Sequence, residues 1–174
     1  MPVGHMIMEF GTRGIARICE SADVDFIVFD MEHSGFDVER LFDLIAWSRS
    51  CSFAPMVRVP QPHYHFLARI MDAGALGVMI GNVETPEAAR DIVAAVKYAP
   101  FGRRGVALGV AHNDYVMPSP TQYMSDINQS AVVICQIESP LGVSNAEWIA
   151  ATPGVDCLWV GHYDLSTSMG IPGD

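Results

Sequence analysis

The chain has 174 residues, of which half are apolar and 17% are charged, and its formal net charge is −10. This length is sufficient for one domain with a sizeable core. The acidic balance argues against nucleic acid and anionic membrane as partners, and the apolar runs are much shorter than a membrane span. No secretory signal pattern opens the chain, so we expect a cytoplasmic protein.

Short apolar runs alternate with longer amphipathic segments along the chain. The apolar runs predict strands at residues 6–10, 25–30, 54–59, 76–80, 131–138 and 155–161. The amphipathic segments predict helices at residues 14–22, 38–50, 64–72, 85–98, 121–129 and 139–152. Residues 100–120 are rich in loop-forming residues and are expected to be irregular.

Six strands that alternate with helices are typical of a parallel α/β fold. A doubly wound sheet and a (β/α)8 TIM-type barrel both fit this order. No glycine-rich phosphate loop follows the first strand, which weakens a dinucleotide-binding interpretation. Polar residues mark the strand ends instead, where a barrel builds its active site: Asp30, Arg58, Asn82, Glu138 and Asp164. We therefore predict the barrel.

The chain is short for such a barrel, because eight strand–helix units need about 250 residues. We expect a single (β/α) barrel domain over residues 1–174 with only about six units, apparently lacking its C-terminal units. The outer edges of the first and sixth strands are then unpaired unless another segment covers them.

Two carboxylates follow the fifth and sixth predicted strands. They belong to Glu138 and Asp164, and Gln136 points to the same face as Glu138 because it lies two residues earlier on the strand. Carboxylate oxygens suit Mg²⁺ or Mn²⁺. Each acid also stands where it can cap the next helix. The pattern alone leaves both interpretations open.

The second and third strands also end in chemically active side chains. Asp30 and His33 bring a carboxylate close to an imidazole, an arrangement that suits a general base near neutral pH. A solvated loop with a structural hydrogen bond is the other interpretation. Arg58 requires an anionic partner at a strand end. That partner is either a substrate carboxylate or one of the acids Asp30 and Glu32.

The lysine and cysteine content limits the chemistry further. Lys97 is the only lysine, and it falls in a predicted helix far from the strand ends, so a Schiff-base mechanism is not expected. The cysteines form no CxxC pair, which favours buried free thiols over a zinc site or a disulfide framework. They are Cys19, Cys51, Cys135 and Cys157.

In combination these residues resemble the HpcH/HpaI aldolases, which are metal-dependent class II pyruvate aldolases of the phosphoenolpyruvate/pyruvate barrel superfamily. The matching motifs occur in the family's order along almost the whole chain. They are Asp30-x-Glu-His33-Ser-Gly35, Val57-Arg58-Val59-Pro60, Asp72-Ala-Gly-Ala-x-Gly77, Gly102-x-Arg104-Gly105, Gln136-Ile-Glu138 and Gly161-x-x-Asp164-Leu-Ser166.

The resemblance implies an activity and a metal. The expected reaction cleaves 4-hydroxy-2-oxo acids to pyruvate and an aldehyde through a metal-stabilised enolate, as in the catabolism of aromatic compounds. Glu138 and Asp164 then resemble the ligands of a divalent metal, which is Mg²⁺, Mn²⁺ or Co²⁺. Gln136 resembles a residue that lies near both metal and substrate.

The resemblance also implies roles for the second and third strand ends. His33 resembles the acid/base histidine of the family, oriented by Asp30. Arg58 resembles the arginine that meets the keto oxygen and stabilises the enolate. Family barrels imply a homo-oligomer, typically a hexamer.

The chain departs from the family pattern beside Asp164. The family usually has Gly-Pro-x-Asp-Leu-Ser, whereas this chain has His162 and Tyr163 after Gly161. We expect these two side chains to contact the substrate, so the departure puts the substrate preference in doubt.

The sequence leaves three rival functions open. One is an acyl-CoA lyase of the citrate-lyase β type, although this acidic chain offers little of the basic groove that such a ligand needs. Another is an aldolase for 2-keto-3-deoxy sugar acids, which differs in substrate only. The third is a non-catalytic barrel fragment, and the intact mass of the purified protein would test it.

Overall fold

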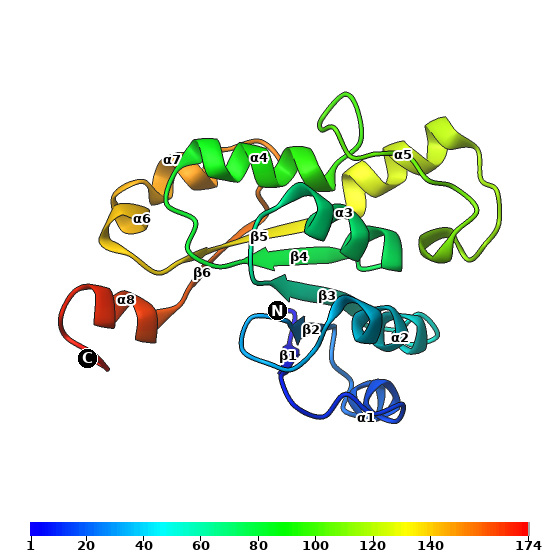
Figure 1. The fold of residues 1–174 in the computed structure, drawn as a ribbon, viewed down its shortest axis with the longest axis horizontal. Helices are drawn as coiled ribbons and strands as arrows, with labels where there is room; N and C mark the ends of the chain where they lie inside the picture. Colours follow the sequence, from blue (N-terminus) through cyan, green and yellow to red (C-terminus); the bar gives the residue numbers. More distant parts are fainter. Residues whose placement is uncertain (174) are drawn as a thin grey trace.

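The computed structural model describes residues 1–173, which contain one six-stranded parallel sheet (Figure 1). The strands are β1 (Gly4–Ile7), β2 (Phe26–Asp30), β3 (Ala54–Val59), β4 (Gly77–Ile80), β5 (Val132–Ile137) and β6 (Cys157–Val160). They are hydrogen-bonded in chain order. A doubly wound sheet reverses its strand order near the centre, so this order excludes it. The strands form part of a TIM-type α/β barrel, as the sequence predicts.

Helices connect the successive strands. They are α1 (Ile15–Ser21), α2 (Val38–Ser48), α3 (Tyr64–Ala73), α4 (Pro86–Val96), α5 (Pro120–Ser130), α6 (Pro140–Ser144), α7 (Ala146–Ala150) and α8 (His162–Ser168), with the 3-10 turn η1 (Ala111–Asn113) before α5. Crossovers of one hand in a sheet of this order bring the helices to one face. Accordingly α2 packs against α3, α3 against α4, and α4 against α7.

The two faces of the sheet carry different layers. Alternate residues such as Phe29, Val57 and Val133 point outward into the main core under the helices. The residues between them point inward and form a second, smaller cluster inside the barrel. Its buried members are Val28, Met56, Met79 and Ile134.

A polar layer lies on top of this inner cluster. Asp30 follows Val28 by two residues on β2, and Arg58 follows Met56 by two residues on β3, so both continue the inward-facing rows. The sheet register places Asp30 directly opposite Arg58. The same alternation that points apolar side chains into the barrel therefore also points polar side chains inward at the carboxyl ends of the strands.

Helix signals in the sequence are confirmed in two places. The buried residues of α2 are Leu41, Leu44, Ile45 and Ser48, and these form the stripe expected from the helical period. Thr85 caps α4 because its side chain accepts a hydrogen bond from the backbone N–H of Ala88, with Pro86 at the first helical position.

Two predicted elements differ from the structure by more than the one or two residues seen at other boundaries. The first strand is Gly4–Ile7 rather than residues 6–10. It begins early because the amino-terminal residues pair with the start of β2: the backbone N–H of Val3 donates to the Asp25 carboxylate at 2.7 Å. The predicted helix 139–152 is two short helices that break at Asn145, whose side chain donates to the backbone oxygen of Glu84 at 2.8 Å.

Within the described residues the sheet is an open half-barrel. β1 has β2 as its sheet neighbour and β6 has β5, so the outer edges of both strands are unpaired, as expected. A hollow of about 590 Å³, lined mainly by apolar side chains, lies beside β1 and α1. None of the helices in residues 1–173 has the length and apolar character needed to cross a membrane.

Candidate active site

A cleft opens at the carboxyl ends of the strands and consists of two adjoining hollows of about 450 and 410 Å³. Both are lined by His33, Glu138 and Asp164. The first, called here the polar hollow, is completed by Glu32, Asn82, Glu84, Ser139, Thr167 and Ser168. The second, called the aromatic hollow, includes Arg58, Gln136, Trp159, His162 and Tyr163.

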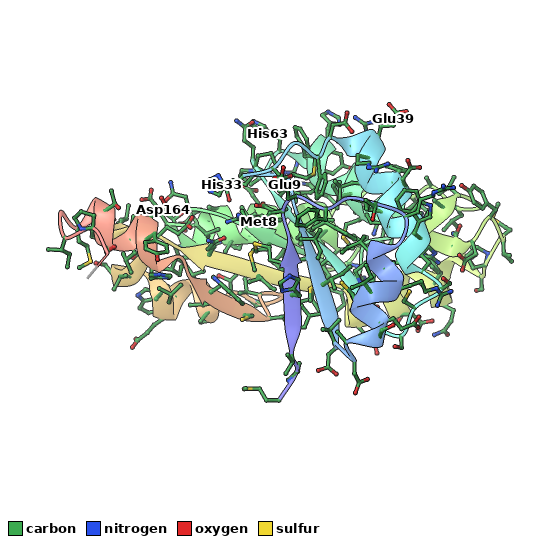
Figure 2. The ribbon with its side chains drawn as sticks, turned by 90° about the horizontal axis from the view of Figure 1, so that it is seen from below. Met8, Glu9, His33, Glu39, His63 and Asp164 are labelled. Atoms are coloured by element: carbon green, nitrogen blue, oxygen red, sulfur yellow. The ribbon has the colours of Figure 1, made fainter. Side chains whose placement is uncertain are left out.

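Figure 2 shows residues that follow different strands along the cleft side of the sheet. His33 follows β2 and His63 follows β3, and both lie at the same end of the strands. Asp164 lies farther along the same edge, on α8. The structure thus brings most of the predicted site residues to one cleft, whereas Asp30 lies buried directly beneath it.

A buried ion pair forms the floor of the cleft. Asp30 is fully buried and Arg58 is 6% exposed. Arg58 donates from Nε to Oδ1 of Asp30 at 2.7 Å and from one terminal nitrogen to Oδ2 at 2.6 Å. Burial acts to raise the pKa of Asp30, but the hydrogen bonds from Arg58 and from two backbone N–H groups outweigh it and lower the pKa below its ordinary value.

Asp30 also organises the loop that carries His33. Its carboxylate accepts hydrogen bonds from the backbone N–H groups of Glu32 at 2.9 Å and His33 at 3.3 Å. The hydroxyl of Ser34 donates to the backbone oxygen of Asp30. Within residues 1–173 no hydrogen bond joins Asp30 to the His33 imidazole, so Asp30 positions this histidine through the main chain.

Glu138 is held by two donors. Its Oε2 accepts from the backbone N–H of Asn82 at 2.8 Å, and its Oε1 accepts from the Gln136 side chain at 2.6 Å. Burial raises the pKa of Glu138, and the nearby carboxylates of Glu32 and Asp164 raise it further. The amide oxygen of Gln136, Oε1, is buried and finds no hydrogen-bond partner among residues 1–173.

Helix capping does not explain either carboxylate. Ser139, rather than Glu138, caps α6 by accepting from the backbone N–H of Gly142 at 3.1 Å. Gly161 is the N-cap residue of α8, and Asp164 lies within the first turn without capping it. Both acids are therefore available for another partner.

The charges around the cleft suit a divalent cation. The carboxylates of Asp30, Glu32, Glu138 and Asp164 lie in or beneath the cleft with one guanidinium, that of Arg58. The guanidinium lies 3.3 Å from Oε2 of Glu32 without hydrogen-bond geometry. A divalent cation would offset most of the excess negative charge. Within residues 1–173 no cluster of three or more His, Cys, Asp or Glu is arranged to hold a metal. Two carboxylates plus water or substrate oxygens match the way Mg²⁺ binds.

Gly161 leaves room for the Glu138 carboxylate. A methyl group on Gly161 would overlap this side chain, lying 2.6 Å from Cγ and 2.8 Å from Cδ. We expect Gly161→Ala to displace the carboxylate and weaken Mn²⁺ binding by about tenfold or more, as disturbed metal surroundings do, measured by titration calorimetry. Gly35→Ala is the matched control, since nothing lies within 4 Å of its added methyl. Equal affinities of the two variants would contradict this geometry.

His162 and Tyr163, the two residues that depart from the family pattern, line part of the aromatic hollow. The rings of His162 and Tyr163 lie 4.1 Å apart between centroids, and Tyr163 is 69% exposed. Trp159 joins them because the register sets it opposite Gln136. Substrate contact by His162 and Tyr163 remains a prediction.

Several features of the site were missed by sequence reasoning or lie outside it. Trp159 lines the cleft without having been assigned a role, while Asn82 was named only as a strand-end residue and Glu32 only as a possible partner of Arg58. Trp159 lies two residues before Gly161 on the predicted strand 155–161, so the period-two alternation is the sequence signal that could have found it. Lys97 lies away from the cleft, as expected: its ammonium donates to the backbone oxygens of Asn128 and Ala131 at the end of α5.

The prediction of buried free thiols is confirmed for two of the four cysteines. The four cysteines are free, and Cys19 and Cys135 are buried. Cys51 is half-buried, and Cys157 is exposed on β6, an outermost strand of the sheet.

Comparison with known proteins matches this geometry to a family. A family model described as HpcH/HpaI aldolase/citrate lyase matches residues 11–174. A 5-keto-4-deoxy-D-glucarate aldolase from Shigella boydii is 36% identical over 153 residues, which are 88% of this chain and 59% of that protein. The chain thus spans less than two thirds of the length of the curated relatives it matches.

Two solved structures share the fold. An HpcH/HpaI aldolase from Desulfitobacterium hafniense superposes with a TM-score of 0.95 at 30% identity, over 99% of this chain and 67% of that one. An HpcH/HpaI aldolase/citrate lyase family protein from Burkholderia cenocepacia superposes with a TM-score of 0.89 at 35% identity, over 99% and 69%.

Proposed function

Because the chain belongs to the HpcH/HpaI aldolase/citrate lyase family, we propose that it acts as a divalent-metal-dependent aldolase. The proposed reaction cleaves 4-hydroxy-2-oxo acids to pyruvate and an aldehyde. The observation that carries the proposal is the pair Glu138 and Asp164 facing one cleft beside Arg58, with neither acid used as a helix cap.

Glu138 and Asp164 would hold the cation. A divalent metal there, Mg²⁺, Mn²⁺ or Co²⁺, supplies Lewis-acid polarisation of the 2-oxo group. Asn82 and Gln136 fix the Glu138 carboxylate in advance, so binding requires little reorganisation. The unpartnered oxygen of Gln136 is then free to accept a hydrogen bond from water or substrate.

Arg58 would stabilise the negative charge that develops on the keto oxygen. Its Nε and one terminal nitrogen are committed to Asp30, which fixes the plane of the guanidinium. The other terminal nitrogen lies toward Glu32 and the cleft. A preorganised cation at this point acts as an oxyanion hole does for acyl transfer.

His33 would move the proton. It takes the proton of the substrate 4-hydroxyl while the C3–C4 bond breaks, so that C4 becomes the aldehyde carbonyl. The electron pair of the broken bond passes through C3 to the C2 oxygen and forms the enolate of pyruvate. A water molecule then protonates C3 to complete pyruvate, and the hydroxide that forms takes the proton from His33.

Replacement of His33 tests this role. We expect His33→Ala to slow turnover by about 10²-fold, the usual contribution of a positioned acid/base group, and to flatten the pH–rate profile. His5→Ala is the control, because His5 is exposed on β1 and lies outside the cleft. Steady-state rates from pH 5 to 9 provide the measurement, and an unchanged profile for His33→Ala would count against it.

The substrate panel tests the function itself. Pyruvate release is measured over a set of 4-hydroxy-2-oxo acids, with Mg²⁺, Mn²⁺ or Co²⁺ and after removal of metal by EDTA. Metal-dependent release supports the proposal, while release that continues after EDTA treatment would show that the reaction does not need the metal.

Oligomeric state and cellular location remain predictions, and gel filtration would test the expected hexamer.

An acyl-CoA lyase has less support from the cleft. The family description includes citrate lyase, and coenzyme A carries phosphates that need cations. Among the residues that line the two hollows, Arg58 is the only lysine or arginine, and Asp30 already neutralises it. Failure to cleave acyl-CoA substrates in the same panel is the expected result.

A further inference from the structure

Asn82 has an unusual backbone conformation at the rim of the polar hollow. It follows β4 and the small residue Gly81, and its φ is +53°, in the left-handed region that side-chain-bearing residues seldom adopt. Asp23, Asp114 and Tyr115 share this feature within residues 1–173, but none of them lines the cleft.

The conformation connects Asn82 to the proposed metal ligand. It directs the backbone N–H of Asn82 to Oε2 of Glu138 at 2.8 Å. This hydrogen bond holds the backbone of Asn82 beside the Glu138 carboxylate. Asn82 is exposed and is one of the residues that line the polar hollow.

The side-chain amide of Asn82 differs from those of the other asparagines. The other three asparagines each bond the main chain: Asn113 accepts from Val110 at 2.9 Å, Asn128 donates to Tyr98 at 3.1 Å, and Asn145 donates to Glu84 at 2.8 Å. Within residues 1–173 the amide of Asn82 makes no such bond. An amide with a free donor and a free acceptor beside a reacting centre is available to a ligand.

The arrangement of the two hollows indicates which part of a substrate would meet this amide. Arg58 and Gln136 line the aromatic hollow, so the 2-oxo acid end belongs there. His33, Glu138 and Asp164 are shared by both hollows and mark the position of the bond that breaks. The aldehyde fragment then lies in the polar hollow, where Asn82 is found.

We propose that Asn82 is a specificity-determining residue that hydrogen-bonds a hydroxyl group on the aldehyde fragment. The inference rests on the proposed aldolase function and narrows its substrate class to hydroxyaldehydes over alkyl aldehydes. A hydroxyl group both donates and accepts, as the amide does. An alkyl group in its place would leave the amide without this partner.

A matched pair of aldehydes tests the proposal in the direction of aldol addition to pyruvate. Glycolaldehyde and propanal have the same number of heavy atoms and differ by one hydroxyl in place of one methyl. Wild-type protein should prefer glycolaldehyde in kcat/KM. Asn82→Gly keeps the backbone N–H and accepts a positive φ, and it should reduce the glycolaldehyde-to-propanal ratio about tenfold, the worth of one hydrogen bond.

The outcomes separate this inference from the function on which it rests. Exchange of the pyruvate methyl protons with D₂O is followed in parallel, because it needs no aldehyde. An unchanged ratio in Asn82→Gly, or a wild-type protein that exchanges pyruvate protons but does not prefer glycolaldehyde, overturns the inference and leaves the aldolase function standing. A wild-type protein without exchange and without product overturns both.

Discussion

Replacing Glu138 by glutamine is expected to abolish metal-dependent cleavage, with a loss of about 10³-fold or more, because a polarising cation contributes several kcal/mol to such reactions. Glutamine keeps the size of the side chain but removes the charge that holds the cation. Asp164→Ala should cause the same loss. Calorimetric titration with Mn²⁺ and the pyruvate-release rate are the two measurements.

A control variant shows whether loss of any carboxylate in the polar hollow weakens metal binding. Glu84→Gln changes a carboxylate in the same polar hollow that accepts a hydrogen bond from Ser139 at 2.6 Å, and it should keep Mn²⁺ affinity near that of the wild type. Metal affinity of Glu138→Gln equal to that of Glu84→Gln would contradict the assignment.

The pKa of Glu138 adds a pH dependence with a defined sign. Burial and neighbouring carboxylates raise this pKa above the ordinary value of 4.5. The folded metal-free protein therefore binds this proton more tightly than the unfolded chain does. Ionisation of Glu138 costs stability as the pH rises from 4.5 through the folded pKa. Thermal unfolding of Glu138→Gln without metal should show its advantage over wild type growing across that interval.

Arg58→Met should cost about 3–5 kcal/mol of unfolding free energy, because it leaves the fully buried Asp30 carboxylate without its counter-charge. The double variant Asp30→Asn/Arg58→Met should recover most of this loss, since a buried amide needs no counter-charge and its oxygen can still accept from the backbone N–H groups of Glu32 or His33. Urea unfolding gives both free energies.

An exposed ion pair provides the comparison for this variant. Arg90 pairs with Glu87 on α4, and both side chains are more than half exposed. Arg90→Met should therefore change stability by about 1 kcal/mol or less. If Arg58→Met were no more destabilising than Arg90→Met, the buried pair would not be the structural floor of the cleft.

Local sequence patterns predicted most of the fold and much of the site. The period-two alternation on β5 placed Gln136 and Glu138 on the inner face, where the structure has them. The buried stripe of α2 was also predicted correctly, because a helix that is buried on one face has apolar residues at the helical period. Arg58 drew attention as a charge within an apolar strand, and the open question of its partner is settled by Asp30, with Glu32 close by.

The features that were missed depend on long-range contacts or on backbone angles. Asn145 breaks the predicted helix 139–152 by bonding Glu84, a residue far away in the sequence. The left-handed conformation of Asn82 leaves no periodic trace, so its bond to Glu138 appears only in three dimensions. The contact of Asp30 with the main chain of His33 is local, but the spacing alone does not distinguish it from a contact with the imidazole.

Exchange of the pyruvate methyl protons in D₂O is the most direct test of the central claim, because it reports enolate formation at this cleft without any assumption about the aldehyde. Proton NMR follows the loss of the methyl signal with Mg²⁺ and after EDTA treatment. The proposed mechanism requires exchange that depends on Mg²⁺, stops with EDTA and is absent in Glu138→Gln. Exchange that continues at the same rate in EDTA, or in Glu138→Gln, would contradict it.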